Sequence, residues 1–353
     1  SGVWIMAYTT IDKPTDYFET TTYAGGTTAI TSLDFSPDFV WAKKRSGAES
    51  HGLFDSVRGA TKAINSDRSN AEDTRSGSLT SFDSNGWSMG GSDGIISNSG
   101  STYVAWAWRG SDSSAASNTD GSITSTVSAN TTAGFSIVKY TGTGSNATIG
   151  HGLGKKPDAI IVKAYEDAQQ WASFWSPIGA TKVLRFNTTN VPSTSSTRWN
   201  NTEPTSSVFS VGNEAEVNTN TEEHIAYCFT SIKGYSKIGT YTGNANTDGI
   251  FIYTGFRPAW VVFKNISTSN DWFTIDIKRD TLAPNNPVGR KSLNLNSSAA
   301  EVTRTTKDMD FVSNGIKLRT ADGTQNNSGE NYIYMAFAET PFVTSTGIPT
   351  TAR

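Results

Sequence analysis

Cysteine, histidine and long apolar runs are scarce in this sequence, and each scarcity excludes a class of protein. A single cysteine, Cys228, cannot form an intrachain disulfide, and a thiolate metal site needs several such residues. No run approaches the roughly 20 apolar residues of a membrane-spanning helix, so membrane insertion is not expected. The start, Ser1 to Trp4, lacks an initiator Met and the profile of a signal peptide. We therefore expect a processed product or the C-terminal part of something longer.

Charge is also sparse, with 29 Lys and Arg against 32 Asp and Glu and a formal net charge of -3. A nucleic-acid partner is not expected, because such proteins carry clustered Lys and Arg that face the phosphates. Gly, Ser, Thr and Asn are abundant instead, together with 10 Trp, 12 Tyr and 17 Phe. This composition predicts a turn-rich chain with a neutral polar surface.

One pattern of proline, five mostly apolar residues and lysine occurs three times, at Pro37–Lys43, Pro157–Lys163 and Pro258–Lys264. Each lysine is followed 12 residues later by the same landmark, which is Asp55, Trp175 or Asp276. Each copy closes with an aromatic or apolar run; these runs are Tyr103–Trp108, His224–Phe229 and Tyr332–Phe337. The chain therefore contains three repeats of roughly 100 residues, which is the length of a domain.

Short β-branched and aromatic segments alternate with Gly, Asn, Asp, Ser and Pro, which predicts an all-β fold. We expect three tandem β-sandwich modules, jelly-roll or lectin-like, of about 100 residues each. The predicted segments are an N-terminal attachment segment (1–16), modules at 17–109, 134–231 and 232–339, a Ser/Thr/Gly-rich linker (110–133) and a C-terminal tail (340–353). The flexible linker predicts that the last two modules pair while the first has more freedom.

The repeated strands are apolar at consecutive positions, so both of their faces should be covered. The lysine that ends each strand is interpreted as the return to solvent, with an apolar stem and an exposed ammonium group. In the closing run, Val104, Trp106 and Trp108 alternate with smaller residues. This alternation predicts a strand with large side chains on one face and small side chains on the other, where a neighbouring element can pack closely.

Catalytic patterns are not found. None of the three histidines, His51, His151 and His224, lies in a nucleophile, metal or acid/base spacing. Asp55 and Asp276 share a repeated position, but Trp175 replaces them in the second repeat, which argues against a catalytic carboxylate pair. We expect no enzyme activity and no cofactor. Calcium is kept as an alternative, because the stretch from Asp322 to Glu330 carries oxygen ligands without the EF-hand spacing.

Two loops are candidate contact surfaces. Trp199 lies in a polar stretch where its ring would be exposed and could stack on a sugar or pack on a neighbouring subunit; the alternative is a ring folded back onto its own domain. The candidate residues of the two loops are Arg198, Trp199, Asn200, Asp322, Asn326 and Asn327.

The first repeat carries the clearest resemblance to a known class of proteins. Its segments Leu53–Lys62, Ser81–Gly86 and Tyr103–Trp108 resemble a module common in structural proteins of marine phages, which are often labelled tail-fibre or appendage proteins. The end of the chain, from Ala338 onward, looks like the end of such proteins. The second repeat departs at Trp175, and the third lacks the Gly-Ala-Thr-Lys of the other two. The family motif offers no catalytic residue.

The resemblance implies a non-catalytic virion appendage protein at the virion surface, outside the cell. We expect a homo-oligomer, with a trimer favoured, that contacts other virion proteins and a glycan or protein receptor on the host, since repeated weak sites gain avidity. One alternative is a purely structural component, such as a capsid decoration or fibre shaft, that binds only virion subunits. A polysaccharide depolymerase is a third reading.

Overall fold

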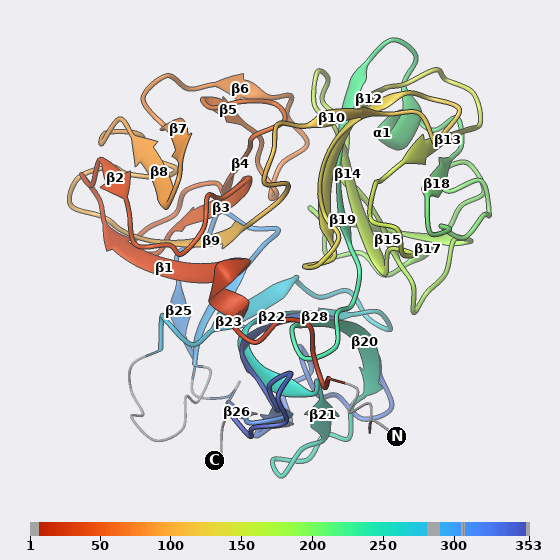
Figure 1. The fold of residues 1–353 in the computed structure, drawn as a ribbon. Helices are drawn as coiled ribbons and strands as arrows, with labels where there is room; N and C mark the ends of the chain where they lie inside the picture. The colour runs from red at the N-terminus through yellow and green to blue at the C-terminus, as the bar shows by residue number, and fades with distance from the viewer. Residues whose placement is uncertain (1–6, 281–289, 305, 307, 351–353) are drawn as a thin grey trace, which may run out of the picture.

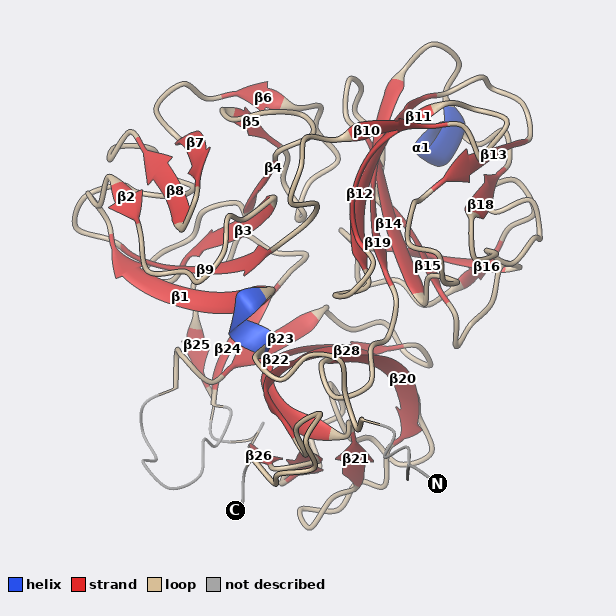
Figure 2. Ribbon diagram, viewed as in Figure 1, coloured by secondary structure: helices blue, strands red, loops and turns tan. Residues whose placement is uncertain are grey.

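The computed structural model describes residues 7–280, 290–304, 306 and 308–350. It is an all-β protein, as predicted: strands pair antiparallel in several sheets, and the helical segments are η1 (Pro14–Asp16) and α1 (Ala215–Asn218) (Figure 2). The outer parts of the predicted attachment segment and tail, 1–6 and 351–353, lie outside the described residues. Three groups of strands surround a common centre (Figure 1).

The first repeat contains a four-stranded and a three-stranded sheet. The larger sheet has the order β1 (Phe18–Ala24), β9 (Thr102–Trp108), β3 (Phe39–Lys44), β4 (Gly52–Asp55). The smaller sheet has the order β2 (Ala29–Ile30), β8 (Gly86–Met89), β7 (Leu79–Asp83), and a separate pair joins β5 (Lys62–Ala63) to β6 (Asp73–Thr74).

The second repeat is built around an eight-stranded sheet. Its order is β10 (Ala116–Asn118), β11 (Ser125–Asn130), β12 (Phe135–Thr141), β19 (Glu223–Phe229), β14 (Ala159–Ala164), β15 (Ala172–Trp175), β16 (Lys182–Arg185), β17 (Ser193–Thr194). The pair β13 (Ala147–Gly150) and β18 (Val208–Val211) faces it. Strands β10 and β11 both come from the segment predicted to be a flexible linker (110–133), so that segment extends the sheet.

The third repeat has a six-stranded and a three-stranded sheet. The larger one has the order β20 (Ser236–Thr242), β28 (Asn331–Pro341), β22 (Phe256–Asn265), β23 (Phe273–Asp276), β24 (Lys291–Asn294), β25 (Val302–Thr303). The smaller one has the order β21 (Phe251–Tyr253), β27 (Gly315–Leu318), β26 (Met309–Val312). In all three repeats the closing run pairs with the Pro-to-Lys strand, so the repeated sequence produces a repeated sheet order.

The Pro-to-Lys strands are buried on both faces, as predicted. Alternate residues point to opposite faces of a strand, so Val40 and Ala42 of β3 join the core of the first repeat. Their neighbours Phe39 and Trp41 face the opposite way and join a cluster that contains residues of all three repeats. The equivalent strands β14 and β22 divide their side chains between their own core and this common core in the same way.

The common core brings the three repeats together around the ring of Trp108, which is 1% exposed. This ring lies 5.3 Å from Phe39, 6.3 Å from Phe229, 5.7 Å from Trp260 and 5.6 Å from Phe337, measured between ring centroids. The prediction that the first repeat has more freedom is therefore wrong, because one face of its large sheet is buried against the other two repeats.

The lysines that end the repeated strands are buried, which corrects the prediction that they return to solvent. Lys43 Nζ donates to Ser298 O in the third repeat (3.2 Å), Lys163 Nζ to Ser69 O in the first (3.0 Å), and Lys264 Nζ to Thr189 O in the second (3.0 Å). The lysine of the second repeat thus donates to a loop of the first, and the lysine of the third donates to a loop of the second. The lysine of the first repeat donates to a loop of the third, which makes the set of contacts cyclic. Burial lowers the pKa of each ammonium group to about 8.

An aromatic side chain eight residues after each lysine makes a second contact between the same pairs of repeats. Trp171 Nε1 donates to Asn65 O of the first repeat (2.9 Å) and Trp272 Nε1 to Arg185 O of the second (3.3 Å). His51 takes this place in the first repeat, with Nε2 3.1 Å from Asn294 O of the third. His51 is therefore a contact between repeats, and burial holds the pKa of its ring well below the usual value.

Candidate functional site

The loop around Trp199 does not expose its ring, so of the two alternatives the ring folded back onto its own domain is confirmed. The loop folds as turns that insert Trp199 into the core of the second repeat, where it is 1% exposed and meets Phe174 edge to face. Arg198 is also buried, with Nε 2.5 Å from Glu216 Oε2. Asn200 remains exposed and accepts a hydrogen bond from Asn146 (2.9 Å).

The second predicted loop is organised by Asn326, which is fully buried and so cannot contact a partner. Its Nδ2 donates to Asn244 Oδ1 (2.9 Å), Asn246 O (3.0 Å) and Thr320 O (2.7 Å), which ties two loops together. Asn327 is exposed, and Asp322 is half-buried and accepts the Thr324 N–H within its own turn (2.8 Å).

No group of three or more His, Cys, Asp or Glu suited to a metal ion is found in the described part of the chain. This holds for the stretch from Asp322 to Glu330, where calcium was kept as an alternative.

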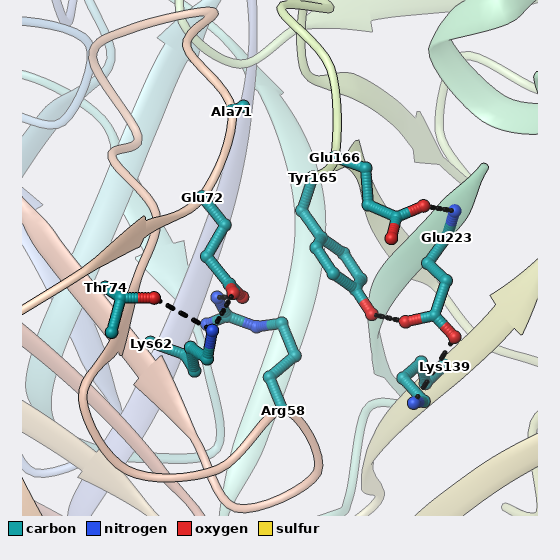
Figure 3. Close-up of a pocket in the computed structure, with 9 residues that line it drawn as sticks. All are labelled: Arg58, Lys62, Ala71, Glu72, Thr74, Lys139, Tyr165, Glu166 and Glu223. Carbon is teal, nitrogen blue, oxygen red and sulfur yellow. Dashed lines mark hydrogen bonds and ion pairs between the residues drawn. The ribbon is translucent and has the colours of Figure 1, made fainter.

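A polar cleft lies between the first and second repeats and is the candidate site (Figure 3). Its volume is about 500 Å³. The loop after β4 and the pair β5–β6 supply one side, whereas β12, the end of β14 and the start of β19 supply the other. Its lining residues are Arg58, Lys62, Ala71, Glu72, Thr74, Lys139, Tyr165, Glu166 and Glu223.

The floor of the cleft is a buried network around Arg58. Its guanidinium group lies 2.6 Å from Asp55 and 3.0 Å from Glu72, and Tyr227 of the second repeat donates its hydroxyl to the same Asp55 oxygen (2.8 Å). Burial, the largest single effect, lowers the pKa of Arg58, but the interactions with Asp55, Tyr227 and Glu72 together outweigh it and raise this pKa above its usual range. Arg58 is therefore charged at neutral pH, and the network joins the two repeats.

The wall from the second repeat is arranged around Glu223. The Tyr165 hydroxyl donates to one carboxylate oxygen of Glu223, and Lys139 Nζ lies 3.4 Å from the other (Figure 3). Glu166 accepts the backbone N–H of Glu223 (2.8 Å). Burial, together with the hydrogen bond to Glu223, raises the pKa of Tyr165 well above its usual value. Tyr165 is thus a neutral hydroxyl at any physiological pH.

The wall from the first repeat pairs Lys62 with Glu72 (3.3 Å) and with the Thr74 hydroxyl (2.8 Å). Glu72 also binds Arg58, so this carboxylate is shared by two cations. Three cations and three carboxylates line the cleft, and each cation has a carboxylate partner. The cleft therefore alternates hydrogen-bond donors and acceptors without a large net charge.

The repeated Asp55 position is explained by the residue that faces it. Asp55 accepts from Tyr227 of the next repeat, and Asp276 accepts from Trp106 Nε1 (3.1 Å) in the same cyclic order. The place of Tyr227 and Trp106 in the third repeat is taken by Met335, which has no N–H or O–H to donate. A buried carboxylate without a donor is costly, which accounts for the apolar Trp175 in the second repeat.

Sequence reasoning named none of the nine residues that line this cleft as a site residue, although Arg58 and Lys62 lie in the segment Leu53–Lys62 that carries the resemblance. The one available signal was the repeated Asp55 position, which was weighed as a catalytic carboxylate and is a contact between repeats. The cleft itself depends on how two repeats meet, and spacing within each repeat carries no information about that meeting.

The fold and the cleft define an all-β protein in which three related sheets close on one apolar core. The chain belongs to the family described as Domain of unknown function (DUF7483), whose model matches residues 13–341. This match spans all three repeats, so the family unit is the complete three-repeat body. Comparison with curated proteins and with solved structures gives no match. Within the described residues, no helix has the length and apolar character needed to cross a bilayer.

Proposed function

We propose that this protein is a non-catalytic structural component of a virion appendage, such as a tail fibre, and that it contacts a glycan on the host cell. Each repeat would be a jelly-roll or lectin-like β-sandwich module of about 100 residues. A homo-oligomer, with a trimer favoured, would add avidity at the virion surface. The observation that carries the proposal is the cleft between the first and second repeats.

The paired charges of this cleft favour a neutral, hydroxyl-rich ligand. A sugar hydroxyl both donates and accepts, so it can bond an ammonium group such as that of Lys62 and a carboxylate such as that of Glu223 without displacing either partner. A charged ligand would have to compete with the ion pairs already present. Glycan contact of this kind is weak at one site and gains strength by repetition.

The same pairing argues for a binding site and against a hydrolase. Glycoside hydrolysis usually needs one carboxylic acid that gives up its proton and one free carboxylate across the scissile bond. Glu72 is held by Arg58 and Lys62, and Glu223 is held by Lys139 and Tyr165. Neither of these two carboxylates is available as an unpartnered acid or base, and the third, Glu166, accepts the backbone N–H of Glu223.

A second candidate function is a purely structural virion component that binds only other virion subunits. It is favoured by Phe251 and Tyr253 of β21, which are 46% and 50% exposed and could be covered by a neighbouring subunit. The common core weakens one argument for oligomerisation, because the faces of the large sheets are already buried within a single chain.

Binding of the purified protein to immobilised neutral polysaccharide from the host surface tests the proposal. Lys62→Gln should weaken binding about threefold to tenfold, since one charge-assisted hydrogen bond is lost. Lys182→Gln is the matched control: Lys182 occupies the same place in the Gly-Ala-Thr-Lys of the second repeat, is exposed and lies outside the cleft. Equal binding by both variants, or no binding of the parent protein to host polysaccharide or host cells, would contradict the proposal.

A further inference from the structure

A second cleft lies where the second and third repeats meet, and its chemistry differs from that of the first. Its volume is about 470 Å³, and we name it the tyrosine cleft after Tyr8 and Tyr253, which line it. We propose that the tyrosine cleft binds an acidic sugar unit of a polysaccharide, with the sugar carboxylate at Lys233 and Lys237 and the sugar ring against Tyr253.

The two lysines of this cleft carry charge that no carboxylate neutralises. Lys233 Nζ lies 4.6 Å from the ring centroid of Tyr8, and Lys237 Nζ lies 5.1 Å from that of Tyr253 and donates to Tyr253 O (2.7 Å). Among the described residues, neither lysine forms an ion pair with a carboxylate. Ring faces and a backbone carbonyl hold an ammonium group in place but leave its full charge to attract an anion.

One carboxylate, that of Asp158, also lines the tyrosine cleft. It accepts the Ser231 backbone N–H (2.8 Å) and the Ser176 hydroxyl (3.1 Å), so both of its oxygens are engaged by the second repeat. Two ammonium groups therefore face one carboxylate whose oxygens are already bonded, and the lining keeps a net positive charge. This is the reverse of the first cleft, where every cation is paired.

The aromatic side of the tyrosine cleft continues along β21. Phe251 and Tyr253 are alternate residues, so they share a face of the strand, and both are about half exposed. Gly315 makes room for the first ring, because a Cβ there would lie 2.7 Å from Phe251. Two rings in line, with cations beside one of them, offer apolar faces for the C–H surfaces of neighbouring sugar units and a positive end for a carboxylate.

The position of Tyr8 is fixed independently of any ligand. Its hydroxyl donates to Gly255 O (2.6 Å), and its ring meets Phe342 edge to face at 6.2 Å between centroids. Gly255 has φ 85, a backbone conformation that favours glycine, so the chain can turn there and present its carbonyl to Tyr8. The cleft is therefore preformed, which lowers the entropy cost of binding.

This inference extends the proposed glycan contact. It rests on the proposed function only in taking the ligand to be a polysaccharide of the host surface. Calorimetric titration of the full chain with a galacturonate trisaccharide should give saturable binding of one molecule per chain. A neutral trisaccharide of the same length should bind about tenfold more weakly. Binding of the acidic trisaccharide should weaken when salt rises from about 0.05 M to about 0.5 M, because exposed charges are screened.

Variants locate the site. Lys233→Gln and Lys237→Gln should each lower the affinity for the acidic trisaccharide about fivefold or more, and Tyr253→Ala should lower it while Tyr253→Phe retains it. Lys155→Gln, which removes an exposed charge elsewhere on the second repeat, should leave it unchanged. Equal affinity for the neutral trisaccharide, or unchanged binding by Lys237→Gln, would overturn the inference. Loss of binding in Lys62→Gln alone would also overturn it, by placing the ligand in the first cleft. If the protein does not bind neutral polysaccharide but still binds the acidic trisaccharide, only the proposed role of the first cleft is rejected.

Discussion

Trp108→Ala should destabilise the whole molecule and not the first repeat alone. Trp108 belongs to the first repeat but meets rings of all three in the common core. Truncation of a buried Trp to Ala costs about 4 kcal/mol, from the lost transfer free energy and the cavity left behind. The size of the unit that unfolds then decides how far the midpoint of thermal unfolding falls.

The entropy of unfolding converts this cost into a temperature shift. At about 2.1 cal/mol/K per residue, 353 residues that unfold together have an entropy change of about 0.7 kcal/mol/K, and the midpoint falls by about 5 °C. A repeat of about 100 residues that unfolded alone would have about 0.2 kcal/mol/K, and its midpoint would fall by about 20 °C.

Differential scanning calorimetry distinguishes these outcomes. We expect one transition that moves as a whole. Phe251→Ala serves as the matched control, because it truncates an aromatic ring that is 46% exposed and should change the midpoint by about 1 °C or less. A transition that splits, with one component displaced by about 20 °C and the rest unmoved, would refute the single common core.

Three further predictions follow from the contacts between repeats. The free energy of unfolding in urea should rise between about pH 7 and pH 9, by about 1 kcal/mol for each of Lys43, Lys163 and Lys264. The pKa of these lysines is about 8 in the folded protein, against an ordinary value of 10.5. The unfolded chain therefore binds more protons than the folded protein in this pH range, and raising the pH favours the folded protein. Lys163→Met should remove roughly one third of that rise, and a flat profile would contradict the buried ammonium groups. Asp55→Asn should cost about 3 kcal/mol in urea unfolding, because Arg58 and Tyr227 lose a buried charged partner; a loss below about 1 kcal/mol, the size expected for an exposed pair, would count against this network. Cys228, whose pKa burial raises to about 12, should not react with a thiol reagent at pH 8 until the chain unfolds, and rapid labelling of the native protein would show that the strand is open.

Most of the fold could be predicted from the repeats within the sequence. The consecutive apolar residues of Pro37–Lys43 correctly indicated a strand covered on both faces, and the alternation of Val104, Trp106 and Trp108 correctly separated a face of large residues from one of small residues. Sequence did not identify what covers the second face, because periodicity assigns a residue to a face but names no partner. The covering partner is the other two repeats.

The errors at individual residues have the same origin. Lys43 was interpreted as a strand end in solvent, although a loop of the third repeat covers it. The polar neighbours of Trp199 left an exposed ring and a ring folded back onto its own domain as alternatives, and turns on either side direct the ring inward. Local composition describes the average surroundings of a segment, and contacts between distant segments override it. The candidate clefts are made by such contacts and were beyond sequence reasoning.

Hydrogen exchange of the full chain tests the closed three-repeat body most directly. The amides of β3, β14 and β22 lie at the centre of their sheets and should require global unfolding to exchange. We expect the same opening free energy for all three strands in the parent protein and the same decrease in all three after Trp108→Ala. Three different values, or a decrease confined to β3, would show that the repeats are separate units and would contradict the account.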